Sequence, residues 1–468
     1  MIGATADARR PAGRADLPGP GARVHLMGIG GAGMRGLAVL LQDAGYRVSG
    51  CDRAPGDALR DLTSRGIRIE GSHDAAHIAG TELLVRSSAV PTDLAEVACA
   101  AAAGVPVMRR ARALGALLGD RTVVGVAGTH GKTTITAMTG HAAAAAGLDP
   151  LVLVGGRVSA WDGFGRLGEG PAIVEADEYD RSFLELRPTV AVVSSLEAEH
   201  LDTYGDLASL RSAFSEFVER ARHAGGLIYC HDDDGARALA ESTGFGFGYG
   251  FGPGAWCRIE TAGPRACRLR WPDGVAEIRL RVPGSHNRLN AAAAFLSVLR
   301  LGGDPGRAAC GLASFRGVAR RLERIADWPG LKVFDDYAHH PTEVAASIAA
   351  LREAHPDARL TVVFQPHLFT RTRDFAGAFA DALSAADEAR VLPVYPAREA
   401  PIPGVGSGLI TGAAPAAEAI DREAALELVS RERTAGDGEA VLVFMGAGDV
   451  TDLAHAAIRR RTGDAVGA

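Results

Sequence analysis

The chain has 468 residues and a mass of 48.5 kDa, a length that predicts about three domains. Its 50 Lys+Arg residues against 56 Asp+Glu residues give a formal net charge of −6, and this balance excludes a dedicated nucleic-acid binder, which carries a basic excess. Mean hydropathy is only +0.06 and no apolar run reaches the roughly 18 residues of a membrane helix, so we expect no membrane insertion.

Residues 1–20 are rich in Ala, Gly, Pro and Arg, and we expect a disordered tail there. No apolar stretch follows the arginines of this tail, so it does not resemble a secretory signal. The six cysteines form no CxxC pair, which argues against a disulfide framework or a zinc site and is typical of a reducing cytosol. We therefore expect a cytoplasmic protein, either a monomer or a homodimer.

The first predicted strand leads into a glycine-rich turn that opens a helix. The turn contains Gly28, Gly30, Gly31 and Gly33, and Asp52 ends the next strand. Glycines let a phosphate approach the backbone, and the N-terminus of a helix favours negative charge. This order of elements predicts a Rossmann-like α/β domain over residues 21–121. From the glycines alone, an NAD-type oxidoreductase is a fair interpretation, and a tight turn without a ligand is the alternative.

A second phosphate-binding motif follows the next apolar strand. Its residues are Gly128, Thr129, His130, Gly131, Lys132, Thr133 and Thr134. Such a loop presents backbone N–H groups to phosphates, with Lys132 at the β- and γ-phosphates and the Thr133 hydroxyl on Mg²⁺. Val126 replaces the usual first glycine, so the loop is a shortened variant, and Lys132 is one of only two lysines in the chain. The motif predicts an α/β domain of the P-loop ATPase type over residues 122–318.

Two acidic segments end later strands of the same predicted domain. Glu175 opens residues 175–180, and His200 lies within residues 197–202. Carboxylates at the C-terminal ends of strands face the crevice where open α/β sheets bind ligands, and Mg²⁺ prefers oxygen ligands. We therefore expect Glu175 and His200 to have a metal or phosphate role. A solvated acidic turn and a packing histidine are the alternatives.

A polar segment then opens an Ala-rich helix with His286, Asn287 and Asn290. Asn amides can pair with an adenine edge, although Asn287 also fits a helix N-cap. In residues 319–468, four apolar strands separated by helices predict a second Rossmann-like α/β domain. Polar residues cluster after its strands, where arginines suit phosphate or carboxylate recognition and surface salt bridges are the alternative. They include Arg321, Asp336, Tyr337, His339 and Arg371.

In their order along the chain, these motifs resemble the Mur ligase family. The likeness runs from about Val24 to Asp449 and includes GTHGKTT, EADEYD, EAEHLDTYG, PGSHNRLNA, DDYAHHPTE, FQPHLFTRT and FMGAGD. It implies an enzyme that uses ATP and Mg²⁺ to join an amino acid to the carboxylate of UDP-N-acetylmuramate in peptidoglycan precursor biosynthesis. The motifs SSLEAEHLDTYG and DDYAHHPTE favour the branch that adds L-alanine. Phe214 agrees, because ligases for later amino acids carry a carbamylated lysine there.

The resemblance also implies roles for individual residues. Those implied for the UDP-sugar are Gly28, Gly30, Gly31, Gly33, Asp52, Ser87 and Ser88. Those implied for ATP are the loop Gly128 to Thr134, His286, Asn287 and Asn290 at the adenine, Asp336 at the ribose and Arg321 at the phosphates. Those implied for Mg²⁺ are Thr133, Glu175 and His200. Those implied for the amino acid are Tyr337, His339 and Arg371. The catalytic set is Lys132, Glu175, His200, Arg321 and His339.

The implied mechanism activates the muramoyl carboxylate as an acyl phosphate, which the amine of L-alanine then attacks. Three alternatives stay open. The first is a recycling ligase that attaches a tripeptide to the same UDP-sugar. The second is a catalytically dead nucleotide-binding regulator on the same fold, and the argument against it is the presence of Lys132, Thr133, Glu175 and His200. The third is the NAD oxidoreductase, which leaves the second phosphate loop unexplained.

Overall fold

The computed structural model describes residues 13–53, 59–161, 163–197, 201–223, 226–397, 399–431 and 438–463. Most of the predicted tail therefore lies outside the described residues, and so does His200. The chain divides into two compact units. Unit 1 comprises Met1–Glu260, Leu269–Ala276 and Leu289–Leu312, and unit 2 comprises Thr261–Arg268, Glu277–Arg288 and Ala313–Ala468.

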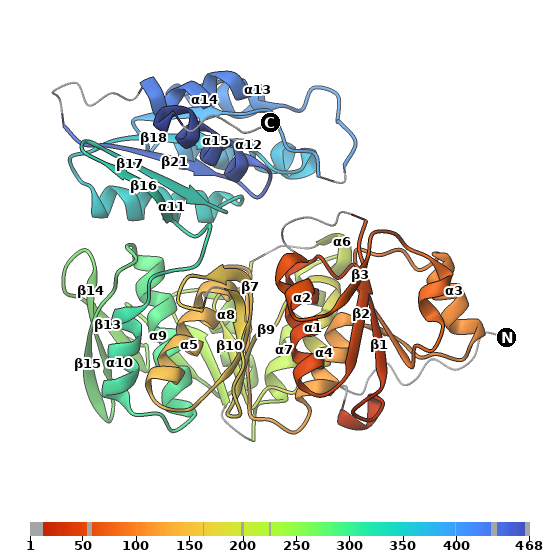
Figure 1. Ribbon diagram of the computed structural model, residues 1–468. Helices are drawn as coiled ribbons and strands as arrows, with labels where there is room; N and C mark the ends of the chain where they lie inside the picture. Colours follow the sequence, from red (N-terminus) through yellow and green to blue (C-terminus); the bar gives the residue numbers. More distant parts are fainter. Residues whose placement is uncertain are drawn as a thin grey trace. The chain divides into compact units, whose positions relative to one another are not determined.

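A five-stranded parallel sheet forms the N-terminal part of unit 1 (Figure 1, red to orange). Its strands are β1 (Arg23–Met27), β2 (Arg47–Cys51), β3 (Arg68–Glu70), β4 (Leu83–Arg86) and β5 (Val107–Arg109). Its helices are α1 (Ala32–Asp43), α2 (Arg60–Ser64), α3 (Ala95–Ala102) and α4 (Arg110–Leu118), with 3-10 turns η1 (Arg14–Asp16) and η3 (Ala75–Ile78). In the order β3-β2-β1-β4-β5, the strands after β1 are added first on one side of it and then, from β4 on, on the other side. Open α/β sheets bind their ligands at such a switch point, beyond the C-terminal ends of the strands.

A ten-stranded sheet follows, in the order β15-β14-β13-β12-β11-β10-β6-β9-β7-β8. Its strands are β6 (Val123–Ala127), β7 (Leu151–Val158), β8 (Gly163–Arg166), β9 (Ala172–Glu175), β10 (Val190–Val193), β11 (Gly226–Cys230), β12 (Phe247–Gly250), β13 (Cys257–Thr261), β14 (Ala266–Trp271) and β15 (Gly274–Arg279). The helical segments are α5 (Lys132–Ala145), η4 (Tyr179–Glu185), α6 (Leu201–Tyr204), α7 (Leu207–Glu219), α8 (Asp234–Thr243), α9 (Ser285–Arg300) and α10 (Pro305–Ser314). Every residue of β6 and β10 is buried, as expected for central strands covered on both faces.

Unit 2 has a six-stranded sheet in the order β16-β17-β21-β18-β19-β20, parallel except for β16 against β17. Its strands are β16 (Glu323–Trp328), β17 (Leu331–Asp336), β18 (Arg359–Phe364), β19 (Glu388–Val391), β20 (Ala417–Ala419) and β21 (Ala440–Met445). Its helices are α11 (Pro341–Ala354), α12 (Phe369–Leu383), α13 (Ser407–Thr411), α14 (Arg422–Arg431) and α15 (Val450–Thr462). The sequence predicted four of these six strands; β16 and β20 lie at the edges and lack the continuous apolar run that marks the others.

The central strands of unit 2 are apolar throughout because both faces are covered. Val441, Val443 and Met445 of β21 pack into one apolar cluster, while Leu442 and Phe444 pack into another. Successive side chains of a strand point to opposite faces, so a strand between two helical layers needs apolar residues at every position.

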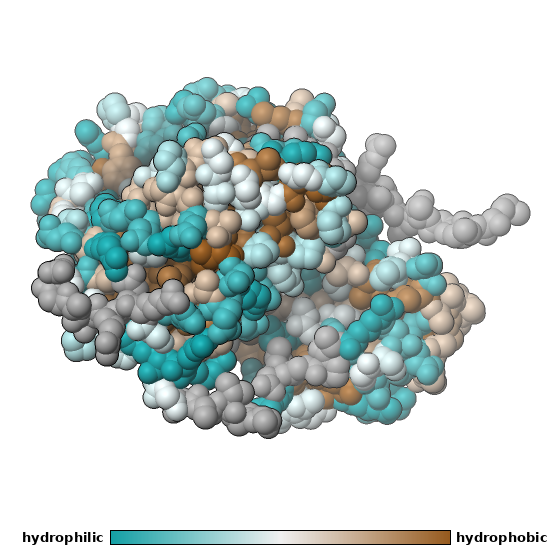
Figure 2. Space-filling model, turned by 90° about the horizontal axis from the view of Figure 1, so that it is seen from above, coloured by the Kyte–Doolittle hydropathy of each residue, from teal (hydrophilic) through white to brown (hydrophobic). Residues whose placement is uncertain are grey.

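Among the described residues, no helix combines the length and the apolarity needed to cross a lipid bilayer. All six cysteines are free thiols. Figure 2 shows one face of the molecule, on which hydrophilic residues are interspersed with smaller hydrophobic patches.

Candidate active site

The N-terminal glycine turn follows β1 and depends on glycine at two positions. Gly28 has φ +74°, and a Cβ there would lie 3.1 Å from Cβ of Ser87. The Gly30 N–H donates to Oδ2 of Asp52 at 2.8 Å, and a Cβ on Gly30 would lie 2.7 Å from the same oxygen. Asp52 and Ser87, both predicted to bind the UDP-sugar, thus brace the turn, while the neighbouring Ser88 is exposed.

The guanidinium group of Arg110 lies against the start of the helix that follows this turn. A Cβ on Gly33, in the first turn of α1, would lie 3.0 Å from Nη1 of Arg110. The first N–H groups of a helix have no partner inside the helix, and together with a guanidinium they attract anions. Arg110 was not predicted from the sequence as a binding residue. Its position directly after β5, as the first residue of α4, is the feature that could have indicated it.

The second glycine-rich loop connects β6 to α5. Gly128 has φ +126° and Gly131 has φ +83°, both in the region that favours glycine. A Cβ on Gly128 would lie 2.9 Å from the backbone nitrogens of Ser194 and Ser195, so the loop passes directly over the end of β10. Only glycine fits at this position.

Lys132, the first residue of α5, is held in place at the loop. Its Nζ donates to the carbonyl oxygen of Gly128 at 2.7 Å and to Oε1 of Glu178 at 2.8 Å. The side chain of Glu178 is 3% exposed. Burial raises the pKa of this carboxyl group, and the Lys132 ammonium offsets part of the rise. Sequence analysis included Glu178 in an acidic segment without singling it out as the partner of the lysine.

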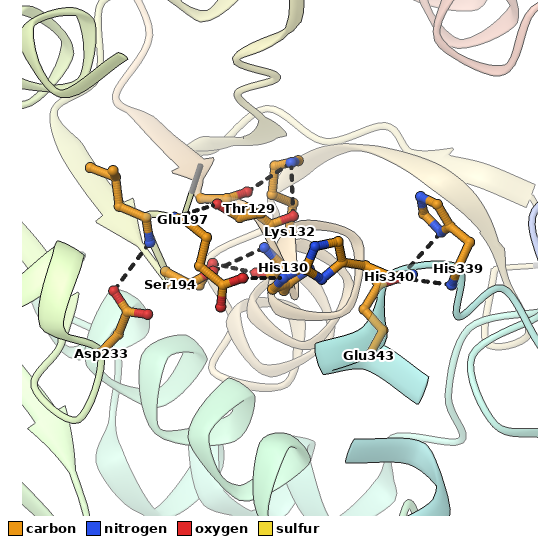
Figure 3. Close-up of polar contacts among 12 residues, drawn as sticks. Thr129, His130, Lys132, Ser194, Glu197, Asp233, His339, His340 and Glu343 are labelled. Atoms are coloured by element: carbon orange, nitrogen blue, oxygen red, sulfur yellow. Dashed lines mark hydrogen bonds and ion pairs between the residues drawn. The ribbon is translucent and has the colours of Figure 1, made fainter. Parts of the chain in front are cut away.

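Further hydrogen bonds attach the same loop to the segment after β10 (Figure 3). The backbone N–H of Glu197 donates to Oγ1 of Thr129 at 3.0 Å, and Ser194 Oγ donates to the carbonyl oxygen of His130. Nε2 of His130 lies 3.4 Å from a carboxylate oxygen of Glu197. Hydrogen bonds and an ion pair between residues 64 to 68 positions apart therefore join the two loops.

One cavity of about 190 Å³ in unit 1 lies between the start of α1 and the segment that follows β9. The N-terminal sheet contributes the start of α1, Ser87 and Arg110 to its lining, and the central sheet contributes Glu175, Asp177 and Gly155. The Gly155 N–H donates to Oε1 of Glu175 at 2.5 Å. Acidic groups on one side and a cation with helix N–H groups on the other suit a metal-bound phosphate meeting an anionic substrate.

Residues predicted to face the adenine do not all lie in one unit. Asn290, in unit 1, is 8% exposed, and a Cβ on Gly131 would lie 2.8 Å from its Oδ1. His286 and Asn287 belong to unit 2. The Asn287 side chain donates to the carbonyl oxygen of Pro283 at 2.7 Å, a local contact at the start of α9. Burial and the nearby Arg288 lower the pKa of His286 to about 4.

Several candidate residues of unit 2 gather around one aromatic ring. The guanidinium carbon of Arg321 lies 5.0 Å from the ring centre of Tyr337, and the rings of Tyr337 and His339 are 5.2 Å apart. Oε2 of Glu343 accepts from the backbone N–H of His339 at 3.1 Å (Figure 3). Oε1 of Glu343 lies 3.9 Å from Nη1 of Arg321. Arginine, imidazole and phenol groups in this arrangement can bind a carboxylate.

The remaining candidates of unit 2 have different surroundings. Asp336 is 3% exposed and accepts from the Ser347 hydroxyl, and burial raises its pKa to about 6. Arg371 is half-buried in the first turn of α12. The preceding Leu368 has φ +70° and donates its N–H to Tyr395 at 2.9 Å, which fixes where α12 begins.

Phe214 and Lys332 both lie outside the cavity lining. Phe214 is 1% exposed and packs edge-on against Phe183 with ring centres 5.1 Å apart, so this position belongs to the apolar core. The second lysine, Lys332, forms an ion pair with Glu439, and its side chain is 22% exposed.

Fold and site together define an α/β protein with two glycine-rich turns, each between a strand and a helix. Three family models match: "Mur ligase family, catalytic domain" over residues 23–122, "Mur ligase middle domain" over 126–298 and "Mur ligase, glutamate ligase domain" over 320–448. The chain belongs to the Mur ligase family, which confirms the resemblance and the prediction of three α/β domains.

Curated relatives and a solved structure extend this likeness over nearly the whole chain. The chain is 43% identical to UDP-N-acetylmuramate–L-alanine ligase of Paenarthrobacter aurescens over 92% of its own length and 95% of the relative. It is 46% identical to the ligase of the same name from Kineococcus radiotolerans, over 92% and 94%. The crystal structure of UDP-N-acetylmuramate-alanine ligase from Thermotoga maritima matches with a TM-score of 0.77 at 27% identity, covering 95% of this chain and all of the other.

Proposed function

We propose that this protein is an ATP-dependent ligase that joins L-alanine to the carboxylate of UDP-N-acetylmuramate in peptidoglycan synthesis. The relatives at 43–46% identity carry this activity in their names, and membership of the Mur ligase family implies the use of ATP. In this proposal residues 21–121 bind the UDP-sugar, residues 122–318 bind ATP and residues 319–468 bind L-alanine.

The observation that carries the proposal is the shared cavity of unit 1. Its lining brings the start of α1 and Arg110 from the sugar side together with Glu175 and Asp177 from the ATP side. A ligase must bring the carboxylate of the sugar to the terminal phosphate of ATP. An oxidoreductase would have no use for the second phosphate loop, which argues against the NAD interpretation.

The chain's own residues supply positioning and charge. A carboxylate oxygen of UDP-N-acetylmuramate attacks the γ-phosphorus of ATP, and ADP leaves. The amine of L-alanine then attacks the acyl carbon of the resulting acyl phosphate, and phosphate leaves. Lys132, held between Gly128 and Glu178, is placed to offset the negative charge that develops during the first transfer. Arg110 and the first N–H groups of α1 would hold the UDP-sugar phosphates.

The donor set at the ATP side fits Mg²⁺. Glu175 and Asp177 line the cavity and offer the oxygen ligands that Mg²⁺ prefers. The phosphates of ATP would complete such a site, and the hydroxyl of Thr133, the second residue of α5, is a third proposed ligand on the family resemblance. The bound ion would neutralise phosphate charge. We keep His200 as a further proposed ligand on the family resemblance alone.

Omission assays test the proposal. Phosphate release should require ATP, UDP-N-acetylmuramate and L-alanine together, and ¹⁸O in the muramoyl carboxylate should appear in the released phosphate because the acyl phosphate passes one oxygen to it. Turnover with the tripeptide in place of L-alanine would favour the recycling ligase. The absence of turnover with either acceptor would favour a nucleotide-binding regulator.

A further inference from the structure

A compact group of metal-ligating side chains lies inside the N-terminal sheet, outside the cavity described above. Its members come from separate elements: His25 from β1, Cys51 from the end of β2, His77 from η3 and Glu96 from α3. One ligand atom from each lies within 4.8 Å of the others. His25 is 2% exposed, Cys51 is fully buried, and the Glu96 side chain has no exposed surface. We refer to these four residues as the His-Cys-Glu cluster.

The contacts within the cluster centre on Glu96. Its Oε1 lies 2.6 Å from Nδ1 of His77, 3.5 Å from Nε2 of His25 and 3.4 Å from Sγ of Cys51. Zinc bonds of about 2.0–2.3 Å in a tetrahedron place neighbouring ligand atoms about 3.3–3.7 Å apart. The separations of His25 and Cys51 from Glu96 already match this spacing, whereas His77 would have to move back from its 2.6 Å contact with Glu96 to bind the same ion.

The orientation of His25 is the second, independent sign of a ligand. Its Nδ1 lies 2.9 Å from the hydroxyl of Ser49, which turns Nε2 toward Glu96. Within the described part of the chain, this buried Nε2 has no hydrogen-bond partner. A metal-binding histidine usually has its other nitrogen hydrogen-bonded in this way, which fixes the ring and leaves the facing nitrogen for the metal.

We infer that the His-Cys-Glu cluster is a structural zinc site, with His25 Nε2, Cys51 Sγ, His77 Nδ1 and one Glu96 oxygen as its four ligands. The chemistry of the donors favours zinc over magnesium, because thiolate and imidazole are ligands of zinc whereas magnesium prefers oxygen. One thiolate and one carboxylate balance the two charges of the ion. Four protein ligands with no open position are typical of structural rather than catalytic zinc.

The surrounding residues support the site from both sides. Nδ1 of His73 lies 3.0 Å from the other Glu96 oxygen and 3.1 Å from Sγ of Cys51, so a protonated Nδ1 can donate to two of the proposed ligands and orient them. The carbonyl oxygen of Cys51 accepts from the N–H groups of Gly28 and Ile29 at 2.8 and 3.1 Å. A metal bound to Cys51 would thereby brace the end of β2 under the glycine turn.

The spacing of these residues in the sequence does not predict a metal site, because they form no short motif. Glu96 lies 19, 45 and 71 residues after His77, Cys51 and His25, and the parallel sheet brings the four residues together. The absence of a CxxC pair argued against a zinc site, but the proposed ligands lie far apart in the sequence.

Metal analysis of the full-length protein tests the inference. Protein purified without added metal or chelator should contain about one zinc per chain. After removal of the metal, Co²⁺ should bind with a thiolate-to-cobalt charge-transfer band in the near ultraviolet, and Zn²⁺ should displace it. Cys51→Ser should remove this band, whereas Cys99→Ser, a half-buried thiol of the same domain outside the cluster, should keep it.

A second variant covers the case in which Cys51→Ser fails to fold. His77→Gln removes a partly exposed ligand and should weaken zinc binding by about tenfold or more while the thiolate band of Co²⁺ persists at saturation. Wild-type protein that contains no zinc, and shows no charge-transfer band with Co²⁺, would overturn the inference, as would a band that survives in folded Cys51→Ser. The cluster would then be a hydrogen-bonded network around Glu96.

Discussion

Nζ of Lys132 lies 2.8 Å from Oε1 of Glu178, a carboxylate 46 residues further along the chain. The pair is almost enclosed, with side-chain exposures of 17% and 3%. A lysine has a flexible stem, so an ammonium held between a carboxylate and the Gly128 carbonyl is placed before a phosphate arrives. In the proposed ligase, the loop is therefore preorganised for the phosphates of ATP.

Lys132→Ala should abolish turnover while leaving the fold intact. Removal of a preorganised charge at the transferring phosphate is expected to lower kcat by about 10²–10³-fold or more. Lys332→Ala is the matched control, because it removes the other lysine of the chain, whose partner Glu439 lies outside the site. Steady-state phosphate release measures both. Wild-type turnover in Lys132→Ala would contradict the P-loop assignment.

Glu178→Gln should raise KM for ATP and lower kcat, together by about tenfold or more, because the amide no longer holds the ammonium by charge. Asp180→Asn is the control: it lies in the same acidic segment, and its ion pair with Arg109 is exposed, so it should have little effect. Equal effects of both variants would show that the acidic segment acts only through its overall charge.

Arg110→Gln should raise KM for the UDP-sugar by about tenfold and leave KM for ATP unchanged, because a charged hydrogen bond contributes about 1.5–3 kcal/mol. The control is Arg112→Gln, two positions on in α4, whose guanidinium pairs with Asp16 and Glu185. A change confined to KM for ATP would place Arg110 on the wrong side of the reaction.

Gly30→Ala should weaken binding of the UDP-sugar, since the new Cβ would lie 2.7 Å from Oδ2 of Asp52 and force that carboxylate off the turn. Gly19→Ala, where nothing lies within 4 Å of the new atom, should behave as wild type. Binding of the UDP-sugar can be measured by calorimetry without ATP. Unchanged affinity in Gly30→Ala would mean that the turn does not contact the ligand.

Asp335→Asn should alter the pH dependence of stability. Burial raises the pKa of Asp335 from 3.8 to about 6, so between these pH values the folded state keeps a proton that the unfolded state loses. This group therefore stabilises the fold at low pH, and its contribution is lost as pH rises toward 6, by about 3 kcal/mol at most. The difference in apparent Tm between Asp335→Asn and wild type should shift in favour of the variant from pH 4 to pH 7. A constant difference would contradict the raised pKa.

Local patterns were sufficient to predict the elements that carry the site. The turn around Gly28 and the loop around Lys132 each follow a strand and open a helix, as their glycines and apolar runs predicted. Edge strands such as β20 were not predicted, because its three residues, one partly buried and two exposed, form no apolar run. His200 stays a prediction, since it lies outside the described residues.

By itself, then, the sequence determined the family, the α/β class and the positions of both phosphate-binding turns, because each is written in a short run of neighbouring residues. Only the tertiary structure decided that Glu178 holds Lys132, that Arg110 lies against Gly33, and that Cys51 meets Glu96. These pairs are 45 to 77 residues apart, and their meeting depends on the order of strands in a sheet, which no local pattern encodes.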